Sequence, residues 1–445
     1  MSARRRGERA DEAAGPAVAH GTGMKPFWKK RWPWVVLSCL AVVGALLLMA
    51  QDQETLRVRS PVATTAPEFV DYLSSLAGAP VTTGDSYEAL QNGDAFYPPM
   101  LAAIENAKRR IVFESFIFSD GEVSARFVDA LSAAARRGVD IRVVLDAIGA
   151  SDLPDERVKA MEDAGVQVRW FNPLHPWQLE ETNYRTHRKV IVIDGQVAFI
   201  GGAGLADHWR GDARNQEEWR DTQFRVRGPA VQLLEACFYE NWIEAGGYSM
   251  PLLEPAPPSE KGPATSITLW SNATGGASNV KLLYLLAIAG ARRTIELQSP
   301  YVLLDASTRF VLDEARARGV RVRLLTEGDE TDAPAVKYAS RGQYQSLLDG
   351  GIEVYEYQPT MMHAKVMVVD RHLSVIGSAN FDNRSLELND EQTSAVFDPA
   401  LAEALATAFE RDLARSRRLS ADEWRRRSLL EKSREKFWGL FGELF

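Results

Sequence analysis

The sequence has very little cysteine. Only two cysteines occur among 445 residues, Cys39 in an apolar run and Cys237 further along. A disulfide within the folded body and a cysteine-based metal cluster are therefore both excluded. No other residues have the spacing of zinc or magnesium ligands, so we expect no metal and no cofactor. Stability must come from packing, and 45% apolar residues suffice for two domain-sized units or one duplicated unit.

Over most of the chain there is no excess of positive charge, because acidic side chains outnumber basic ones. The formal net charge is −8, and because residues 1–31 carry eight basic and three acidic side chains (+5), residues 32–445 carry −13. A body of that charge lacks the basic surface that attracts a polyanion such as DNA. We therefore expect no nucleic-acid partner.

One long apolar run is present, at residues 32–50. Its 19 residues carry no charge, and a bilayer core needs about 20. Lys29, Lys30 and Arg31 stand directly before it, which predicts a transmembrane helix with the N-terminus inside and the body outside. A cleaved signal peptide is the alternative, although residues 48–50 fit a cleavage site poorly.

A second membrane candidate lies at the C-terminus. Residues 411–436 hold ten basic and five acidic side chains. The apolar positions after them follow the spacing of one helix face: Phe437, Leu440, Phe441, Leu444 and Phe445. Such a helix lies either in an anionic lipid interface or against the body with a solvated basic face.

The chain repeats itself. Three segments recur in the same order in each half, and each reads as helix followed by strand. The matching pairs are residues 107–116 with 291–301, 127–146 with 310–326, and 158–173 with 344–359. This alternation predicts βαβ units and largely parallel sheets with helices on their faces. Two such units in tandem predict a pseudo-twofold α/β body in which two copies of one site face each other.

Each half ends in the same motif, HxK(x)4D followed after six residues by a glycine turn. The residues of the two motifs are His187, Lys189, Asp194, Gly201 and Gly202 in the first half, and His363, Lys365, Asp370, Gly377, Ser378 and Asn380 in the second. The His and Lys side chains point to one face, and the Val/Ile run after each Lys predicts a buried strand. Two of only six histidines head these matching motifs. The others lack this context and are expected to be structural: His20, His175, His208 and His372.

These residue types suit the cleavage of a phosphodiester. The negative charge of a phosphodiester repels nucleophiles, and Lys189 and Lys365 supply positive charge against its oxygens. Asn380 and the hydroxyl of Ser378 add neutral donors. One imidazole attacks phosphorus while the other protonates the leaving alkoxide, which divides the displacement into two steps through a covalent intermediate.

The double motif resembles the phospholipase D superfamily over roughly residues 90 to 435. Within it, residues 378–391 (SANFDNRSLELNDE), the segment at 219–221 (WRD) and the arginine-rich tail look like the bacterial cardiolipin synthase branch. The resemblance implies two phospholipase D-like domains around one active site, in addition to the N-terminal transmembrane helix. One departure is Gly204, where the family pattern offers an asparagine matching Asn380.

The resemblance also implies roles. His187 is the nucleophile and His363 the general acid and later base, while Asp194 and Asp370 brace the motifs. The residues alone leave open which histidine attacks. Aligning the halves on Pro229 and Pro399 gives an offset of 170 and matches Asp221 with Glu391. These two carboxylates are the candidates for orienting the imidazoles, and Gly202 is expected to offer its backbone amide.

The domain boundaries follow from these features. We expect a basic cytoplasmic tail (1–31), a transmembrane helix (32–50), a linker (51–85), a first phospholipase D-like domain (86–250), a linker (251–265), a second such domain (266–410) and a basic, amphipathic C-terminal helix (411–445).

The family resemblance implies a cardiolipin synthase-like phosphatidyltransferase. It would exchange the glycerol of one phosphatidylglycerol for a second phosphatidylglycerol, in the bacterial inner membrane with its body on the periplasmic face. A phospholipase D that uses water, or a related phosphodiesterase, would need the same machinery. Residues 174–186, which contain Trp177 and Tyr184, either line the acceptor pocket or form a covering loop. A non-enzymatic scaffold is disfavoured because both motifs are intact, and the oligomeric state is left open.

Overall fold

The computed structural model describes residues 55–173, 183–253, 261–272 and 279–442, together with the isolated residues 34 and 38. The chain divides into two units, Met1–Asp52 and Gln53–Phe445, and every element below belongs to the second. The expected membrane span at 32–50 lies, apart from residues 34 and 38, outside the described residues. Within the part of the chain that is described, no helix combines the length and the apolar character that crossing a bilayer requires.

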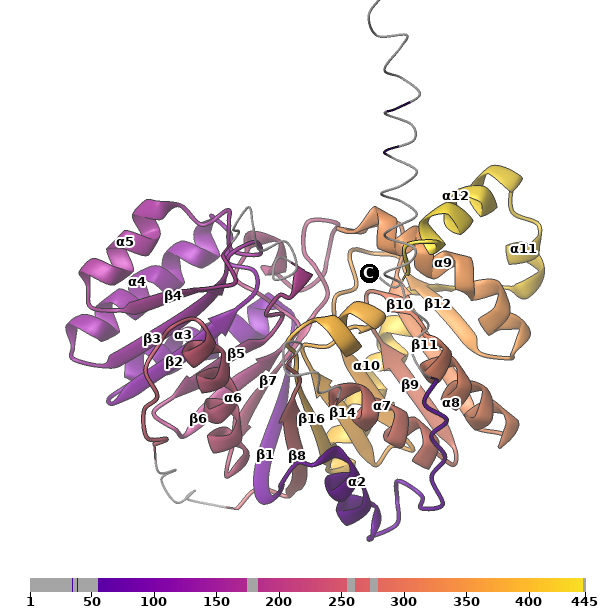
Figure 1. Cartoon of the computed structure of the whole chain (residues 1–445), viewed down its shortest axis with the longest axis horizontal. Coiled ribbons are helices and arrows are strands. Elements are labelled where there is room, and N and C mark those ends of the chain that lie inside the picture. Colours follow the sequence, from indigo (N-terminus) through magenta and orange to yellow (C-terminus); the bar gives the residue numbers. More distant parts are fainter. Residues whose placement is uncertain are drawn as a thin grey trace, which may run out of the picture. The chain divides into compact units, whose positions relative to one another are not determined.

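The second unit is built on one 15-stranded sheet (Figure 1). The strands of the first half are β1 (Val81–Gln91), β2 (Arg110–Ser115), β3 (Asp140–Asp146), β4 (Gln167–Phe171), β5 (Lys189–Ile193), β6 (Val197–Gly201) and β7 (Thr222–Arg227). Those of the second half are β8 (Ala264–Trp270), β9 (Thr294–Gln298), β11 (Arg321–Glu327), β12 (Glu353–Tyr357), β13 (Val366–Val369), β14 (Leu373–Gly377), β16 (Gln392–Phe397) and the edge strand β17 (Ser416–Arg418). The short strands β10 (Val302–Leu303) and β15 (Phe381–Asp382) pair separately.

The order of the strands has the symmetry that the internal repeat predicts. From one edge to the middle the first half runs β4-β3-β2-β5-β6-β7-β1. Inside the edge strand β17, the second half runs β12-β11-β9-β13-β14-β16-β8 to the middle. The two halves meet where β1 pairs antiparallel with β8, with Val81 opposite Ile267. The tandem of two α/β repeats is therefore confirmed.

The expectation of a largely parallel sheet is wrong. Only β2-β3-β4 and β9-β11-β12 are parallel, and the other neighbouring strands in the sheet are antiparallel. The physical reason is loop length. Residues 194–196 join β5 to β6 and residues 370–372 join β13 to β14, whereas a parallel crossover needs about a dozen residues. The sheet is therefore mixed.

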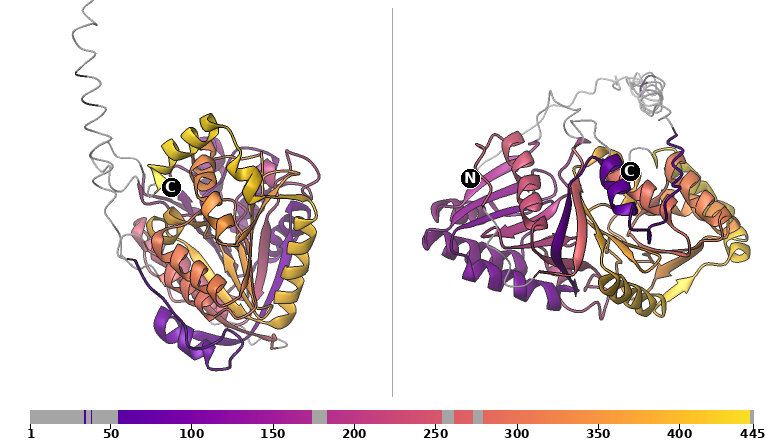
Figure 2. Two further views of the ribbon diagram at one scale, coloured as in Figure 1. Left: turned by 90° about the vertical axis from the view of Figure 1, so that its right-hand side faces the viewer. Right: turned by 90° about the horizontal axis from the view of Figure 1, so that it is seen from below.

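Helices cover both faces of the sheet (Figures 1 and 2). Those of the first half are α3 (Gly93–Asn106), α4 (Glu122–Arg136), α5 (Asp155–Asp163), the 3-10 turn η2 (Asp207–Trp209) and α6 (Ala230–Glu244). Those packed with the second half are α2 (Phe69–Ala77), α7 (Asn279–Gly290), α8 (Ala306–Ala317), α9 (Pro334–Asp349), the π-helical turn η3 (Arg384–Leu388), α10 (Pro399–Leu413), α11 (Ala421–Arg425) and α12 (Leu429–Gly439). Each half has its own core on one face, and a third core with residues from α6, α10 and strands of both halves joins them on the other.

The segment expected to be a linker at 51–85 is more than a connection. It contains α2 and the start of β1, and Phe69 and Leu73 are fully buried in the core of the second half. The amphipathic pattern of α2 explains this placement, because its apolar side chains must be covered. Helix α2 therefore packs against the second half, although it precedes the first half in the sequence.

The expectation of one C-terminal helix at 411–445 is also corrected. This segment holds the end of α10, the edge strand β17, α11 and α12. Helix α12 lies against α9, and Glu435, which is 3% exposed, forms ion pairs with Arg341 and Arg427. The packed alternative thus holds for α12, yet its other side exposes Leu429, Leu430, Phe437 and Leu440. Leu444 and Phe445 lie outside the described residues.

Candidate active site

Both motif histidines lie just before a buried strand. His187 precedes β5 and His363 precedes β13, whose residues are all buried. The backbone N–H of His187 donates to the backbone carbonyl of Asp390 (2.9 Å), and the backbone N–H of His363 donates to that of Arg220 (2.7 Å). Asp390 and Arg220 come directly before the two candidate carboxylates, so the backbone brings each histidine to the carboxylate of the opposite half.

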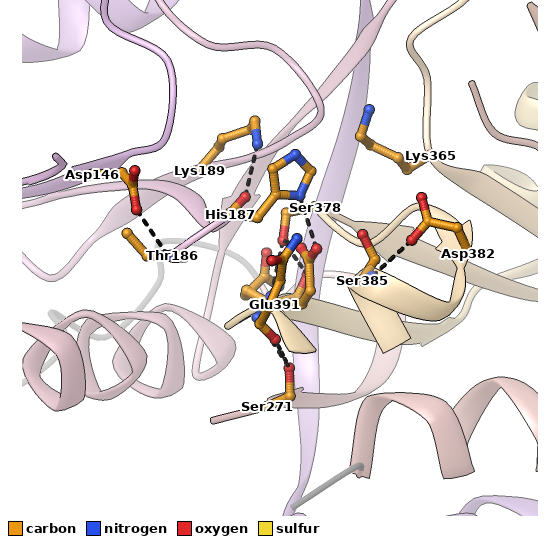
Figure 3. Close-up of polar contacts among 12 residues, drawn as sticks. Asp146, Thr186, His187, Lys189, Ser271, Lys365, Ser378, Asp382, Ser385 and Glu391 are labelled. Carbon is orange, nitrogen blue, oxygen red and sulfur yellow. Dashed lines mark hydrogen bonds and ion pairs between the residues drawn. The ribbon is translucent and has the colours of Figure 1, made fainter. Parts of the chain in front are cut away.

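The side chains complete this crossed arrangement. Nδ1 of His187 lies 2.8 Å from Oε1 of Glu391, and Nδ1 of His363 lies 2.7 Å from Oδ2 of Asp221. Figure 3 shows the first of these pairs. Both carboxylates are fully buried, and a carboxylate at Nδ1 fixes the ring orientation and directs Nε2 to the reacting atoms. Nε2 of His363 also lies 3.2 Å from Nζ of Lys365.

Other groups hold the carboxylates in turn. The Ser378 hydroxyl donates to Oε2 of Glu391 (2.5 Å), and the Glu391 N–H donates to the Ser271 hydroxyl (3.0 Å; Figure 3). In the other half-site the indole N–H of Trp209 donates to Oδ2 of Asp221 (3.0 Å). Ser378 was expected to donate to the substrate, but its hydroxyl is directed to the carboxylate of Glu391.

The two lysines lie beside the imidazoles, on opposite sides of the His187 ring in Figure 3. Lys189 Nζ donates to the carbonyl of His187 (2.8 Å), and Lys365 Nζ donates to that of His363 (2.6 Å). Burial lowers the pKa of Lys189 to about 7, helped by Lys365, and lowers the pKa of Lys365 to about 8 against the charge of Asp221. Ammonium groups so poorly solvated favour an anionic ligand.

The histidines are neutral at rest. Burial lowers the pKa of His187 to about 4, with Lys189 and Lys365 opposing the charge of Glu391. Burial also lowers the pKa of His363 well below its ordinary value, and Lys365, Lys189 and His187 add to the effect. Because the lysines act on both rings, the two half-sites form one electrostatic centre.

This geometry is accompanied by a clear relationship to known proteins. The family model described as cardiolipin synthase, PLD-like domain matches residues 100–219 and 284–413. The chain belongs to this family. The two matched segments contain both HxK(x)4D motifs, and the first segment ends at residue 219, two residues before Asp221.

Two curated relatives and one solved structure illustrate the relationship. Cardiolipin synthase 1 of Bacillus anthracis is 30% identical over 399 residues, which cover 87% of this chain and 78% of that protein. Cardiolipin synthase A of Pseudomonas fluorescens (strain SBW25) is 33% identical over 362 residues, 81% of this chain and 75% of that protein. The phosphatidylserine synthase of Haemophilus influenzae Rd KW20 superposes with a TM-score of 0.65 at 13% identity, covering 85% of this chain and 100% of that one. This last likeness shows a shared fold.

Within this phospholipase D-like arrangement, the motif aspartates lie apart from the imidazoles. Asp194 accepts hydrogen bonds from the backbone N–H groups of residues 108, 109 and 110 (2.7–2.9 Å). Asp370 likewise accepts from the N–H groups of residues 292, 293 and 294 (2.7–2.9 Å). Each carboxylate therefore ties the far end of its motif strand to the start of β2 or β9, and neither joins the reacting groups.

The glycine-turn residues differ between the two half-sites of this family member. Asn380 is buried, and among the described residues its Oδ1 has no hydrogen-bond partner, so this oxygen can accept a hydrogen bond from a ligand. Gly202 lies against Asp221, because a Cβ there would stand 2.8 Å from both Oδ2 of Asp221 and the carbonyl oxygen of His363. Gly202 thus makes room for the carboxylate.

An aromatic group at the same site was not predicted from the sequence, although Trp219 lies in the 219–221 segment that resembles the cardiolipin synthase branch. The rings of Trp209 and Trp219 lie 5.3 and 5.5 Å from the His363 ring, centroid to centroid. His208, assigned no role from its context, lies 3.8 Å from the Trp219 ring. Phe116 lies 5.2 Å from the His187 ring. Their position in the sequence, between the first motif and Asp221, could have indicated that Trp209 and Trp219 lie near the site. The same position is equally compatible with tryptophans that only fill the hydrophobic core.

Two expectations stay predictions: the role of residues 174–186 in an acceptor pocket and the absence of a metal. Most of the segment at 174–186 with its expected acceptor-pocket role, including Trp177, lies outside the described residues, although the Tyr184 carbonyl accepts a hydrogen bond from Asn172 (3.0 Å). Among the described residues, no group of three or more His, Cys, Asp or Glu side chains is placed to hold a metal ion.

Proposed function

We propose that this chain is a cardiolipin synthase that converts two molecules of phosphatidylglycerol into cardiolipin and glycerol. The observation that carries the proposal is the pair of imidazoles in one buried centre, each held at Nδ1 by the carboxylate of the opposite half and each accompanied by a lysine. The cardiolipin synthases that match most of the chain support the choice of substrate.

In the first step, Nε2 of neutral His187 attacks the phosphorus of one phosphatidylglycerol. The P–O bond to the headgroup glycerol breaks, and that oxygen takes a proton from Nε2 of His363, so glycerol leaves. Glu391 accepts the Nδ1–H of His187 and stabilises the positive charge that develops on the ring. Lys189, Lys365 and the Asn380 amide donate to the non-bridging oxygens. His363 must take up the transferred proton as substrate binds, because it is neutral at rest.

In the second step, His363 acts as a base. It takes the proton from the terminal hydroxyl of a second phosphatidylglycerol while that oxygen attacks phosphorus and the P–N bond to His187 breaks. Cardiolipin is released and His187 is neutral again. His363 holds the proton of the acceptor hydroxyl, which it can donate in the next turnover or lose to solvent to return to its neutral resting state. One phosphodiester replaces another, so the reaction needs no nucleotide cofactor.

Analysis of the products tests the proposed activity. Purified enzyme is incubated with phosphatidylglycerol labelled in its headgroup glycerol and, separately, in its acyl chains. Cardiolipin with an equal amount of free glycerol is expected. Phosphatidic acid in place of cardiolipin would identify a phospholipase D that uses water, and no product at all would contradict both.

Trapping the intermediate tests the role of each histidine. The His363→Ala variant keeps the proposed nucleophile, and should form a phosphatidyl adduct on His187 when given a lipid whose leaving group needs no protonation. The His187→Ala variant should form none. An adduct on His363 in the second variant would reverse the two roles.

A bacterial inner-membrane location is part of the proposal. Residues 32–50 would span the bilayer once, with the basic residues 1–31 in the cytoplasm and the catalytic body on the periplasmic face, because of the apolar run and the lysines and arginine before it. Protease added to spheroplasts should digest the body and leave a fragment that carries an N-terminal tag. Protection of residues beyond 50 in intact spheroplasts would overturn this topology.

A further inference from the structure

The two half-sites support their carboxylates in different ways. In one, Ser378 donates its hydroxyl to Glu391, and Asn380 follows two residues later. The equivalent positions in the other half-site are Gly202 and Gly204, which have no side chain to offer. The carboxylate of Asp221 must therefore find its support elsewhere.

Both glycines are required by close contacts. A Cβ on Gly202 would collide with Oδ1 of Asp221 and stand 2.8 Å from Oδ2. A Cβ on Gly204 would lie 2.7 Å from the carbonyl oxygen of Ile117 and 3.2 Å from Cζ3 of Trp209. The space that Ser378 and Asn380 occupy in one half-site is thus taken by Asp221 and by an indole ring in the other.

That indole belongs to Trp209, at the end of η2. The side chain is fully buried, and its Nε1–H donates to Oδ2 of Asp221 (3.0 Å). The same oxygen lies 2.7 Å from Nδ1 of His363. The rings of Trp209 and His363 meet edge to face, with an angle of 66° between their planes. The other carboxylate oxygen, Oδ1, accepts the Thr222 N–H (2.7 Å). The indole therefore touches both members of the pair.

We propose that Trp209 is a positioning residue for the transfer reaction: its indole N–H holds Asp221 as the Ser378 hydroxyl holds Glu391, and thereby orients His363. The proposal rests on the proposed function, because His363 is the proton carrier there. A buried carboxylate that loses one of its hydrogen-bond donors is ionised to a smaller extent, and its side chain can rotate more freely. The ring of His363 would then meet the leaving oxygen in the wrong orientation.

Two substitutions separate the N–H from the ring. Trp209→Phe keeps an aromatic side chain without a donor, and site-specific replacement of Trp209 by β-(3-benzothienyl)alanine keeps the bicyclic shape while sulfur replaces N–H. Each should lower kcat by roughly 10- to 100-fold, the effect of one hydrogen bond to a charged group, and leave KM for phosphatidylglycerol nearly unchanged. The matched control is Trp242→Phe, which removes a buried indole N–H that donates to the Tyr248 carbonyl (3.1 Å) and should leave kcat unchanged.

A second readout does not need turnover. The Nδ1 proton of His363 should give a low-field NMR resonance, assigned by its absence from His363→Ala, and this resonance should shift in both Trp209 variants. It should stay in place in Trp242→Phe, as should the corresponding His187 resonance in all three. Shifted resonances in a protein whose wild type makes no cardiolipin would support the positioning role and contradict the proposed function. An active wild type whose benzothienylalanine variant keeps full kcat and an unshifted resonance would overturn the positioning role.

Discussion

At the scale of single residues, the candidate active centre combines two neutral imidazoles with two lysines whose pKa values are lowered. Desolvation is the common cause, since each of the four side chains is buried and each of their pKa values is lowered. The carboxylates respond differently. Burial raises the pKa of Asp221 to about 6 despite Lys365, whereas His187, Lys189 and Ser378 outweigh burial and lower the pKa of Glu391. The half-site of His187 therefore holds the more firmly ionised carboxylate.

These pKa values predict the pH dependence of kcat/KM, which reports the free enzyme. As pH rises through about 4, His187 loses its proton and becomes a nucleophile, so activity should rise. As pH rises further, His363 takes up the proton needed for the first step less readily, because its pKa is lowered. Through about 7 and 8, Lys189 and Lys365 also lose their protons and their attraction for phosphate, so activity should fall. The sequence predicts a bell-shaped profile from two coupled imidazoles, and the structure adds the two lysines to its alkaline limb.

The measurement is initial rate against pH in mixed micelles, with enzyme stability checked at each pH. Lys365→Arg is the companion variant, because an arginine keeps its proton throughout this range. The variant should retain the limb near 7 and lose the one near 8. A wild-type rate that does not fall between pH 7 and 9 would contradict the assignment.

At the scale of elements, each motif strand has the candidate reacting residues at or just before its first residue and a structural aspartate after its last. His363 and Lys365 stand at the start of β13, and Asp370 follows its end, roughly 20 Å along an extended chain from His363. Besides three backbone N–H groups, Asp370 accepts the hydroxyl of Thr64 (2.9 Å). The aspartate of the motif thus joins β13, β9 and the N-terminal segment of the body.

Replacing Asp370 by alanine should therefore destabilise the fold and spare the chemistry. Leaving these donors without a charged acceptor should cost about 3 kcal/mol of unfolding free energy, measured by urea denaturation. The folded variant should keep kcat within a few-fold of wild type. Asp313→Ala removes a half-exposed carboxylate whose ion pair is with Arg309 and should cost less than about 1 kcal/mol. Loss of kcat with unchanged stability would show instead that Asp370 takes part in the reaction.

Helix α12 combines a packed side with an exposed apolar side. Its Glu435 is held between Arg341 and Arg427, while Leu429, Leu430, Phe437 and Leu440 face outward. Basic residues around them, including Lys432 and Lys436, complement an anionic lipid surface. The packed and the lipid-bound alternatives are therefore compatible, and α12 supports the proposed membrane contact of the body.

A fluorescent probe tests this contact on the full chain. In a Cys39→Ser background, an NBD label on Phe437→Cys should shift to shorter wavelength in nanodiscs that contain phosphatidylglycerol and resist an aqueous quencher. Phe437 is 54% exposed, and the control Tyr248→Cys lies at an 87% exposed position away from α12. Equal quenching at both positions would show that α12 stays in water.

At the scale of the whole molecule, one chain supplies both half-sites. The central β1–β8 pair and the core shared by α6 and α10 join the halves, and each carboxylate serves the histidine of the other half. Removing either half would thus leave a histidine without its carboxylate. The arrangement makes the active site a property of the tandem, and neither repeat contains a complete copy.

A mixing experiment tests whether the site forms within one chain. His187→Ala and His363→Ala should each be inactive, and a mixture of the two, co-expressed or combined, should remain so. Wild type mixed with either variant provides the control and should show activity in proportion to its share. Recovery of a substantial fraction of wild-type activity in the variant mixture would mean that histidines of two chains share one site.

Much of this protein can be predicted from its sequence, because the signals are local or repeated. Hydrophobic runs after Lys189 and Lys365 predict two buried strands, and the internal repeat predicts the pseudo-twofold tandem. The offset of 170 between the halves selects Asp221 and Glu391 by counting. What it cannot select is the partner of each, since a carboxylate within its own half and one across the interface are equivalent in a linear alignment.

Tertiary structure decided the crossed pairing of histidines and carboxylates, the mixed direction of the sheet, and the hydrogen bond from Trp209 to Asp221. The physical reason is the same for all three. Each depends on contacts between segments distant in the chain, set by how strands pair and how side chains fill a shared core. By itself the sequence determined which residues are the candidates for the chemistry, because residue type and spacing are written in it directly.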